Sequence, residues 1–208
     1  MSRLCIFGAD GRTGIQVVKT ALADGHDVVA FVYDKENMNH FDESVQVIHG
    51  NILDALAVEE AINGVDIVIS VVGHIKNSDP LMQTKGIKNI ISAMKKNNIK
   101  RLVSLTGTGA RIPGDTPSLA DRFLNMIVNK IDPERINDGK EHLVAIQESH
   151  LDWTILRVLK LTNSDFNGKY NLTEHGPVEL TTSRRRVARI MIDLAISEDY
   201  IGKMPISS

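Results

Sequence analysis

Short apolar segments alternate with amphipathic segments along almost the whole chain. The apolar segments are rich in β-branched residues, which is typical of strands that are covered on both faces of a parallel sheet. They lie at residues 4–7, 28–32, 45–48, 65–72, 101–105 and 153–157. Between them, apolar residues recur every three or four positions, which predicts helices. The predicted helices lie at residues 12–23, 54–62, 81–94, 119–130, 133–149 and 183–196.

This alternation predicts an α/β fold with a doubly wound, mostly parallel sheet and helices on both faces. No linker separates two domains, so residues 1–208 are expected to form a single domain. Toward the end the pattern changes: residues 161–176 are loop-rich, residues 178–180 predict a short strand, and Pro205-Ile206 predicts an edge strand. Residues 153–208 are therefore expected to contribute a small lobe on the substrate side.

The clearest local motif is the glycine-rich stretch Gly8-Ala9-Asp10-Gly11-Arg12-Thr13-Gly14. It follows the first predicted strand and opens the first predicted helix, which is the context of a dinucleotide-binding loop. Unpaired N–H groups at such a helix start meet the charge of a pyrophosphate. The alternative is a tight turn without a ligand, and a P-loop is disfavoured because no Gly-Lys-Ser/Thr follows. The context favours a Rossmann-type domain that binds a nicotinamide dinucleotide here.

Five further stretches share a pattern with a known family: residues 49–54, 71–73, 82–95, 148–157 and 183–188. With the glycine loop they are spread over essentially the whole chain. On these residues the chain resembles the atypical short-chain dehydrogenases/reductases, in the group of NmrA-like proteins and the flavin reductase also called biliverdin reductase B. The resemblance implies an NAD(P)(H) cofactor and a catalytic or regulatory role that depends on it.

The expected cofactor contacts fall into four groups along the chain. They are Gly8, Asp10, Gly11, Arg12, Thr13 and Gly14 in the loop, Tyr33 and Asp34 after the second strand, Asn51 and Ile52 near the adenine, and Val72, Gly73, His74, Thr106 and Gly107 toward the nicotinamide. The seven histidines show no metal-ligand spacing, so no metal site is expected.

The choice between NAD and NADP stays open at this point. Similar NADP-dependent proteins place an arginine after the second strand, where this chain has Tyr33. Asp34 follows, and a carboxylate there favours a free ribose hydroxyl and hence NAD. Arg12 and Lys35 favour the opposite choice, and Asp10 brings a negative charge to the loop.

The usual catalytic acid of the superfamily is missing. None of the three tyrosines is followed by lysine four residues later, as Tyr-x-x-x-Lys requires. The serine and histidine used by the flavin-reducing relatives correspond to Gly107 and Lys160. Thr106 and Lys160 are therefore the catalytic candidates, with hydroxyls at Ser104 and Thr108 nearby and Lys140 as another proton donor if burial lowers its pKa.

Two functions follow from these residues. The first is an NAD(P)H-dependent oxidoreductase that transfers hydride to a small planar acceptor such as a flavin or quinone. The alternative is a non-catalytic NAD(P) sensor of the NmrA-like type, which the departures at Gly107 and Lys160 favour. An epimerase or dehydratase is less favoured because those enzymes also use the tyrosine.

Composition limits the kinds of binding partner that are expected. The 24 basic and 26 acidic residues give a net charge of −2, which favours neither nucleic acid nor an anionic membrane. The lone Cys5 lies in an apolar run and is expected to be buried, and the chain is expected to be cytoplasmic, as a monomer or homodimer, with a small-molecule acceptor. His142 and His150 are expected at the surface, Trp153 in packing, and Arg184–Arg186 on a solvated face or against carboxylates.

Overall fold

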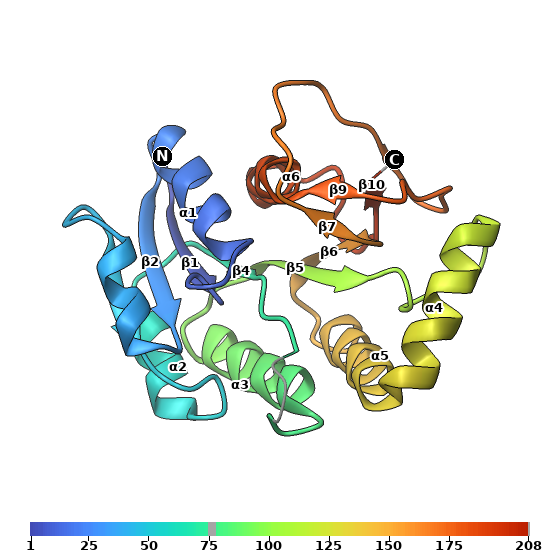
Figure 1. Cartoon of the computed structure of the whole chain (residues 1–208). Coiled ribbons are helices and arrows are strands. Elements are labelled where there is room, and N and C mark those ends of the chain that lie inside the picture. The colour runs from blue at the N-terminus through green and yellow to red at the C-terminus, as the bar shows by residue number, and fades with distance from the viewer. Residues whose placement is uncertain (75–77, 208) are drawn as a thin grey trace.

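The sheet of this computed structural model, which describes residues 1–74 and 78–207, has its strands in the order β3-β2-β1-β4-β5-β6-β10-β8 (Figure 1). The first seven strands in this order are parallel, and β8 pairs antiparallel with β10. The strands are β1 (Arg3–Phe7), β2 (Asp27–Val32), β3 (Gln46–His49), β4 (Ile67–Ser70), β5 (Arg101–Gly107), β6 (Asp152–Val158), β8 (Leu172–Thr173) and β10 (Ile206–Ser207). The predicted doubly wound α/β fold is confirmed.

Helices cover both faces of this sheet, as Figure 1 shows. One face carries α1 (Gly14–Ala23) and α6 (Arg184–Ile196), which pack against each other. The opposite face carries α2 (Ala55–Ile62), α3 (Met82–Lys96) and α5 (Pro133–Gln147), and α4 (Leu119–Ile131) lies beyond α5. A short 3₁₀ helix, η1 (Lys35–His40), follows β2. No helix among residues 1–74 and 78–207 combines the length and the apolar character needed to cross a bilayer.

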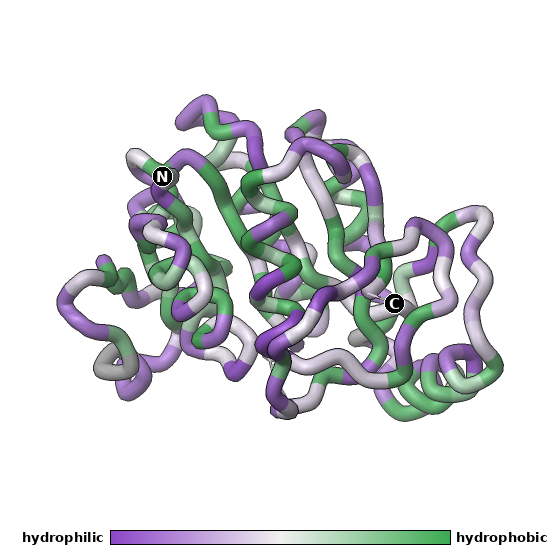
Figure 2. The backbone as a smooth tube through the Cα atoms, turned by 90° about the horizontal axis from the view of Figure 1, so that it is seen from above, coloured by the Kyte–Doolittle hydropathy of each residue, from purple (hydrophilic) through white to green (hydrophobic). Residues whose placement is uncertain are grey.

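Two buried apolar clusters hold the three layers together. One joins the sheet to α2, α3 and α5 through residues such as Ile62, Ile90 and Ile146, and the other joins it to α1 and α6 through residues such as Val18 and Met191. Figure 2 shows hydrophobic colour along the strands in the middle of the molecule. Burial on both faces explains why these strands read as continuous apolar runs. Cys5 lies in this core, as expected, and burial raises the pKa of its thiol.

The strand order reverses next to β1, whose neighbours are β2 on one side and β4 on the other. In open parallel sheets of this kind, ligands bind outside the carboxyl ends of the strands at such a reversal. The first turn after β1 is the glycine loop, so the topology places this loop at that position.

The C-terminal segment differs in detail from its prediction. Residues 178–180 form no strand; instead β8 lies in the stretch predicted as loop-rich. Pro205 lies outside the strand, and β10 lies between β6 and β8 rather than at the edge. Strands of two residues are defined by the partner they pair with and not by their own pattern, which explains both errors. β6, α6 and β10 join the main layers, and β7 (Leu161–Thr162) pairs with β9 (Thr182–Ser183) in a separate small sheet.

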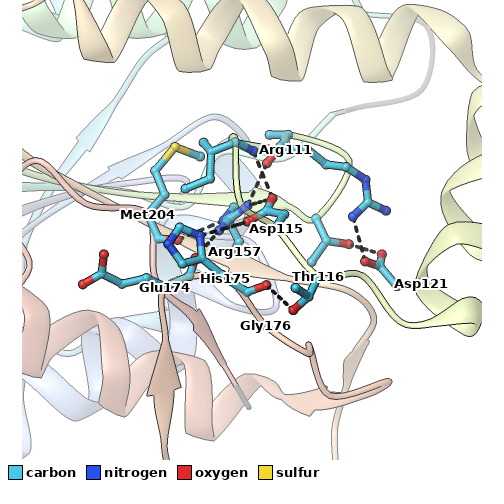
Figure 3. Close-up of polar contacts among 12 residues, drawn as sticks. Arg111, Asp115, Thr116, Asp121, Arg157, Glu174, His175, Gly176 and Met204 are labelled. Atoms are coloured by element: carbon cyan, nitrogen blue, oxygen red, sulfur yellow. Dashed lines mark hydrogen bonds and ion pairs between the residues drawn. The ribbon is translucent and has the colours of Figure 1, made fainter.

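A buried ion pair attaches the loop after β5 to the sheet (Figure 3). Arg157 of β6 is fully buried and binds both carboxylate oxygens of Asp115. Its other N–H groups donate to the carbonyl oxygens of Ala110, Met204 and Glu174. Burial by itself would raise the pKa of Asp115, but hydrogen bonds from Arg157 and the N–H of Ile112 hold it below its usual value. This one side chain therefore joins three segments that are distant in sequence.

Candidate functional site

A cavity of about 980 Å³ lies along the carboxyl ends of the strands. Its volume is at the upper end of the range for small-molecule and cofactor sites. The glycine loop forms one side of it. The residues after β2, β3, β4, β5 and β6 form the floor, and parts of α4 and α5 with the start of α6 complete the walls.

The glycine loop has the geometry of a phosphate-binding turn. Gly8 has a φ of +77°, and a Cβ there would meet the backbone of Val71 and Val72 at 3.2 Å. A Cβ on Gly14 would lie 2.0 Å from the carbonyl oxygen of Gly8, so the helix start packs directly on the strand end. Glycine is required at these two positions for different reasons, a left-handed turn at the first and contact between two backbones at the second.

The start of α1 leaves donors for an anion. Within the described chain, the backbone N–H groups of Arg12, Thr13 and Gly14 have no hydrogen-bond partner. Thr13 is the N-cap residue, yet its hydroxyl makes no capping bond. These groups line the cavity, where the positive end of the helix dipole adds to their attraction for a phosphate. The residues present therefore fit the pyrophosphate of a dinucleotide.

Two arginines face the same part of the cavity from opposite sides. Arg12 comes from the glycine loop and Arg184 from the first turn of α6. Burial lowers the pKa of Arg184, and the positive charge of Arg12 lowers it further. Arg184 donates to Asn163, whereas Arg185 and Arg186 pair with Asp165 and Glu179 as anticipated for carboxylate contacts.

Asp10 turns away from the phosphate site toward the end of β2. Its Oδ2 accepts hydrogen bonds from the N–H groups of Tyr33 and Asp34 at 3.1 and 3.0 Å. Tyr33 lines the cavity, but Asp34 does not. The Asp34 carboxylate instead caps η1 by accepting from the N–H of Glu36. The structure therefore does not support the expected contact from Asp34, because the 3₁₀ turn after it uses this carboxylate as its cap.

Asn51 and Ile52 lie where the adenine is expected. Both line the cavity, and the Asn51 side-chain oxygen accepts from the N–H of Leu53, which fixes the turn before α2. The Ile52 carbonyl oxygen accepts from Asn89 of α3, and the Ile52 side chain packs against Gly86. Two anchors from α3 therefore set the shape of this wall.

The residues expected near the nicotinamide also line the cavity: Val72, Gly73, His74, Thr106, Gly107 and Lys160. His74 is notable because its Nδ1 is shielded from water and has no partner among the described residues. A buried polar atom without a partner is costly, so this nitrogen is suited to a hydrogen bond with a ligand. Lys160 is exposed at the cavity edge, and Lys140 does not line the cavity.

Beyond these residues the cavity becomes apolar. Ala110 lies after β5, Leu124 and Val128 come from α4, Ile136 comes from α5, and Val158 ends β6. Asn125 adds a polar group here, but its amide donates to Asp121 and Thr108, so it is held in the α4 network. This chamber and Arg184 were not predicted from the sequence, because the residues come from segments that only the folded chain brings together. One signal was available for Arg184. Helices that follow the strands of a parallel sheet begin at the carboxyl edge of that sheet, and Arg184 lies at the predicted start of such a helix.

His142 is buried and not at the surface, contrary to its prediction. Its Nδ1 faces the carbonyl oxygen of Gln83 at 3.3 Å, and its Nε2 lies 3.0 Å from the hydroxyl oxygen of Ser104. Because a carbonyl only accepts, Nδ1 carries the proton and Ser104 donates to Nε2. This pair joins β5, α5 and α3. Because Ser104 is fully buried, the pair cannot contact a hydride acceptor bound in the cavity.

A buried carboxylate supports the same junction. Asp138 of α5 accepts from the N–H groups of Gln83 and Thr84 and from the Thr84 hydroxyl. The N-cap residue of α3, Leu81, makes no side-chain cap. Asp138 therefore caps α3 from a neighbouring helix, at the point where Met82 and Gln83 line the cavity.

The buried imidazole predicts a loss of stability in mild acid. Burial lowers the pKa of His142 below its usual 6.5. In the unfolded chain the ring takes up a proton near pH 6.5, whereas in the folded chain it stays neutral to lower pH, so protons favour unfolding. The free energy of unfolding should therefore fall as pH drops below about 6.5, by at most about 1.4 kcal/mol per pH unit for this one group.

Urea unfolding between pH 5 and 7 measures this effect. His142→Asn should flatten the dependence, apart from the contributions of other groups. His150→Asn is the matched control, since His150 is exposed and its left-handed backbone, with a φ of 59°, accepts asparagine. Equal slopes for the wild type and H142N would contradict the assignment.

Comparison with known proteins identifies the class. The model of the NAD(P)H-binding family matches residues 8–198, and the chain belongs to this family. This match agrees with the resemblance found in the sequence, and the cofactor is NAD(P)(H), as that resemblance implied.

Individual relatives are more distant. The phenylcoumaran benzylic ether reductase IRL1 of Ginkgo biloba is 36% identical over 98 residues, which cover 43% of this chain and 32% of the relative. The chain thus spans about a third of the length of the first curated relatives it matches. Among solved structures, the NADP complex of a short-chain dehydrogenase/reductase from Veillonella parvula has a TM-score of 0.81 at 19% identity, covering 100% of this chain and 94% of the other. ChuY, an anaerobillin reductase from Escherichia coli O157:H7, also has a TM-score of 0.81, at 22% identity and with 99% and 97% covered.

Proposed function

We propose that this protein is an NAD(P)H-dependent reductase that transfers hydride to a small planar acceptor such as a flavin or quinone. The observation that carries the proposal is the continuity of the cavity: it runs from the glycine loop to an apolar chamber formed by Leu124, Val128 and Ile136. A ligand chamber of this kind, mostly apolar with a few polar groups, suits an aromatic ring system.

The chain's own residues divide the work of binding. The N–H groups at the start of α1 and the guanidinium groups of Arg12 and Arg184 hold the pyrophosphate. Asn51 and Ile52 form the wall for the adenine, and Gly73 and Gly107 leave space for a ring because a Cβ at either position would meet nothing within 4 Å. The bound reduced nicotinamide supplies the hydride. Alignment of donor and acceptor is then the main contribution of the protein.

The proton that completes the reduction has a different source from that of the typical superfamily member. Tyr33 lies at the adenosine end, and the Tyr170 hydroxyl donates to Asp193 on the α1–α6 side of the sheet. We place His74 and Thr106 at the nicotinamide end as the groups that hold or pass the proton, with Lys160 at the cavity edge. Flavins and quinones also take protons from water, so a dedicated acid is not required.

Two of the relatives carry reductase names, which supports the reaction class. IRL1 is named a phenylcoumaran benzylic ether reductase and ChuY an anaerobillin reductase. Both names describe a reductase. Because the identity is low and the coverage is partial, we infer the hydride acceptor of this chain from the residues of its own chamber and not from these relatives.

Oxidation of NADH and NADPH with a panel of flavins and quinones tests the proposal. Val128→Arg should fill the chamber and lower kcat/KM for the acceptor by at least about tenfold, while leaving the Kd of the cofactor unchanged. Val144→Arg is the matched control, because Val144 is exposed on α5 and does not line the cavity. Absence of turnover over the panel, with cofactor bound, would contradict the proposal.

A sensor role is the second candidate, and one observation favours it. Helix α4 leaves Leu119, Phe123, Met126 and Ile131 exposed, directly beside the chamber. Such an apolar face is typical of a protein-binding surface. Partner capture that changes with the redox state of the cofactor, in a protein without turnover, would favour this role over the reductase.

A further inference from the structure

Asp10 contacts the end of β2, the part of the fold at which the two nicotinamide cofactors are distinguished. NADP carries a phosphate on the adenosine ribose, and dinucleotide-binding folds read this position at the end of the second strand. In this chain that strand end is held by Asp10, whose carboxylate accepts both N–H groups that follow β2, those of Tyr33 and Asp34. Asp10 and Tyr33 both line the cavity.

From this geometry we infer that Asp10 makes the protein select NAD(H) over NADP(H). This inference rests on the proposed use of a reduced nicotinamide cofactor and names which one is used. The specificity determinant lies in the glycine loop and not after β2, since Asp34 is turned toward η1.

Hydrogen-bond chemistry gives the first reason. An ionised carboxylate only accepts hydrogen bonds. Within the described residues, Asp10 receives both of its bonds on Oδ2, so Oδ1 remains for a ligand. The ribose hydroxyls of NAD donate to such an oxygen. A phosphate on the ribose is itself an acceptor at neutral pH, so the same contact would bring two acceptors together.

Charge gives the second reason. A phosphate monoester carries about −1.5 to −2 at pH 7, and a fixed carboxylate within a few ångströms repels it. In addition, the two N–H groups that could bind this phosphate are already used by Asp10. The anion site at the end of β2 is therefore occupied by a side chain of the protein itself.

The nearby cations do not compensate for this charge. Arg12 lies in the same loop as Asp10 and lines the cavity, and its positive charge lowers the pKa of Arg184 at the start of α6. Lys35 does not line the cavity. The remaining cavity-lining cations are Lys160, which follows β6, and Arg184, which opens α6, so neither belongs to the segments that hold the end of β2. Within residues 1–74 and 78–207, none of these cations forms an ion pair with Asp10.

Equilibrium titration of the purified protein with NADH and NADPH tests the inference without requiring an acceptor. The wild type should bind NADH at least about tenfold more tightly than NADPH. Asp10→Asn keeps an acceptor oxygen for Tyr33 and Asp34 but removes the charge, and it should reduce the ratio about tenfold, mainly through tighter NADPH binding. Competition by 5′-ADP and 2′,5′-ADP should show the same preference, because these compounds contain only the adenosine half.

Asp27→Asn is the matched control, since it removes the same charge from the opposite, exposed end of β2 and should leave the ratio unchanged. Equal or tighter binding of NADPH by the wild type would overturn the inference while leaving the reductase function intact. A preference for NADH that D10N does not reduce would also overturn it. Binding of neither cofactor would overturn the inference together with the proposed function.

Discussion

Replacing Gly14 with alanine should abolish binding of both nicotinamide cofactors. The added methyl group would lie 2.0 Å from the Gly8 carbonyl oxygen and 2.7 Å from the Ala9 Cα. Both are backbone atoms that no rotamer change can move. The loop and the start of α1 must separate by on the order of 1 Å, which displaces the three N–H groups that face the phosphate. A loss of at least about 100-fold in affinity is expected.

Titration with NADH and NADPH measures this loss, and circular dichroism of the same samples verifies that the variant is folded. Gly168→Ala is the matched control: Gly168 is exposed, and its Cβ would make only an ordinary contact with Phe166 at 3.9 Å. It should bind like the wild type. If folded G14A bound either cofactor with wild-type affinity, the phosphate site would not be at this loop.

Removing the buried guanidinium has the largest expected effect on stability. Arg157→Met should lower the free energy of unfolding by about 3–5 kcal/mol, because it leaves the Asp115 carboxylate buried without its partner. The carbonyl oxygens of Ala110, Met204 and Glu174 lose their donors as well. Denaturant unfolding at neutral pH measures the change.

Two further variants show whether the unpaired charge is the cause. Arg185→Met removes an exposed arginine that pairs with the exposed Asp165, and it should cost about 1 kcal/mol or less. The double variant R157M/D115N neutralises the carboxylate and should recover part of the loss. A change within about 1 kcal/mol for R157M alone would contradict the role assigned to this ion pair.

The main layers of the fold could be predicted from the sequence because their signals lie within each element. Strands buried on both faces have continuous apolar runs, and the helices that cover them have one apolar side. Caps such as Asp54 and Ser183 also act locally, since both side chains accept hydrogen bonds from N–H groups in the first turn of the helix that follows. The short strands at the C-terminal end have neither signal, so residues 178–180 were predicted wrongly.

The candidate site also has one part that could be predicted from local sequence and one part that depends on distant residues. The glycine loop is contiguous, and its glycines, helix start and strand end all lie within eight residues of sequence. The interactions of His142 are of the other kind, since Ser104 and Gln83 are 38 and 59 residues away. A histidine on an amphipathic helix gives no sign of such partners. The apolar chamber could not be predicted for the same reason, and the inferred choice of cofactor depends on the direction in which the Asp10 side chain turns.

The cap that α5 provides for α3 has a consequence for how the cavity responds to ligands. The first turn of a helix normally frays, because its N–H groups lack partners. Here a carboxylate from the neighbouring helix restrains that turn, together with the part of the cavity wall it carries. The wall is thus preorganised before any ligand arrives, and closure over a ligand would have to come from segments outside this junction.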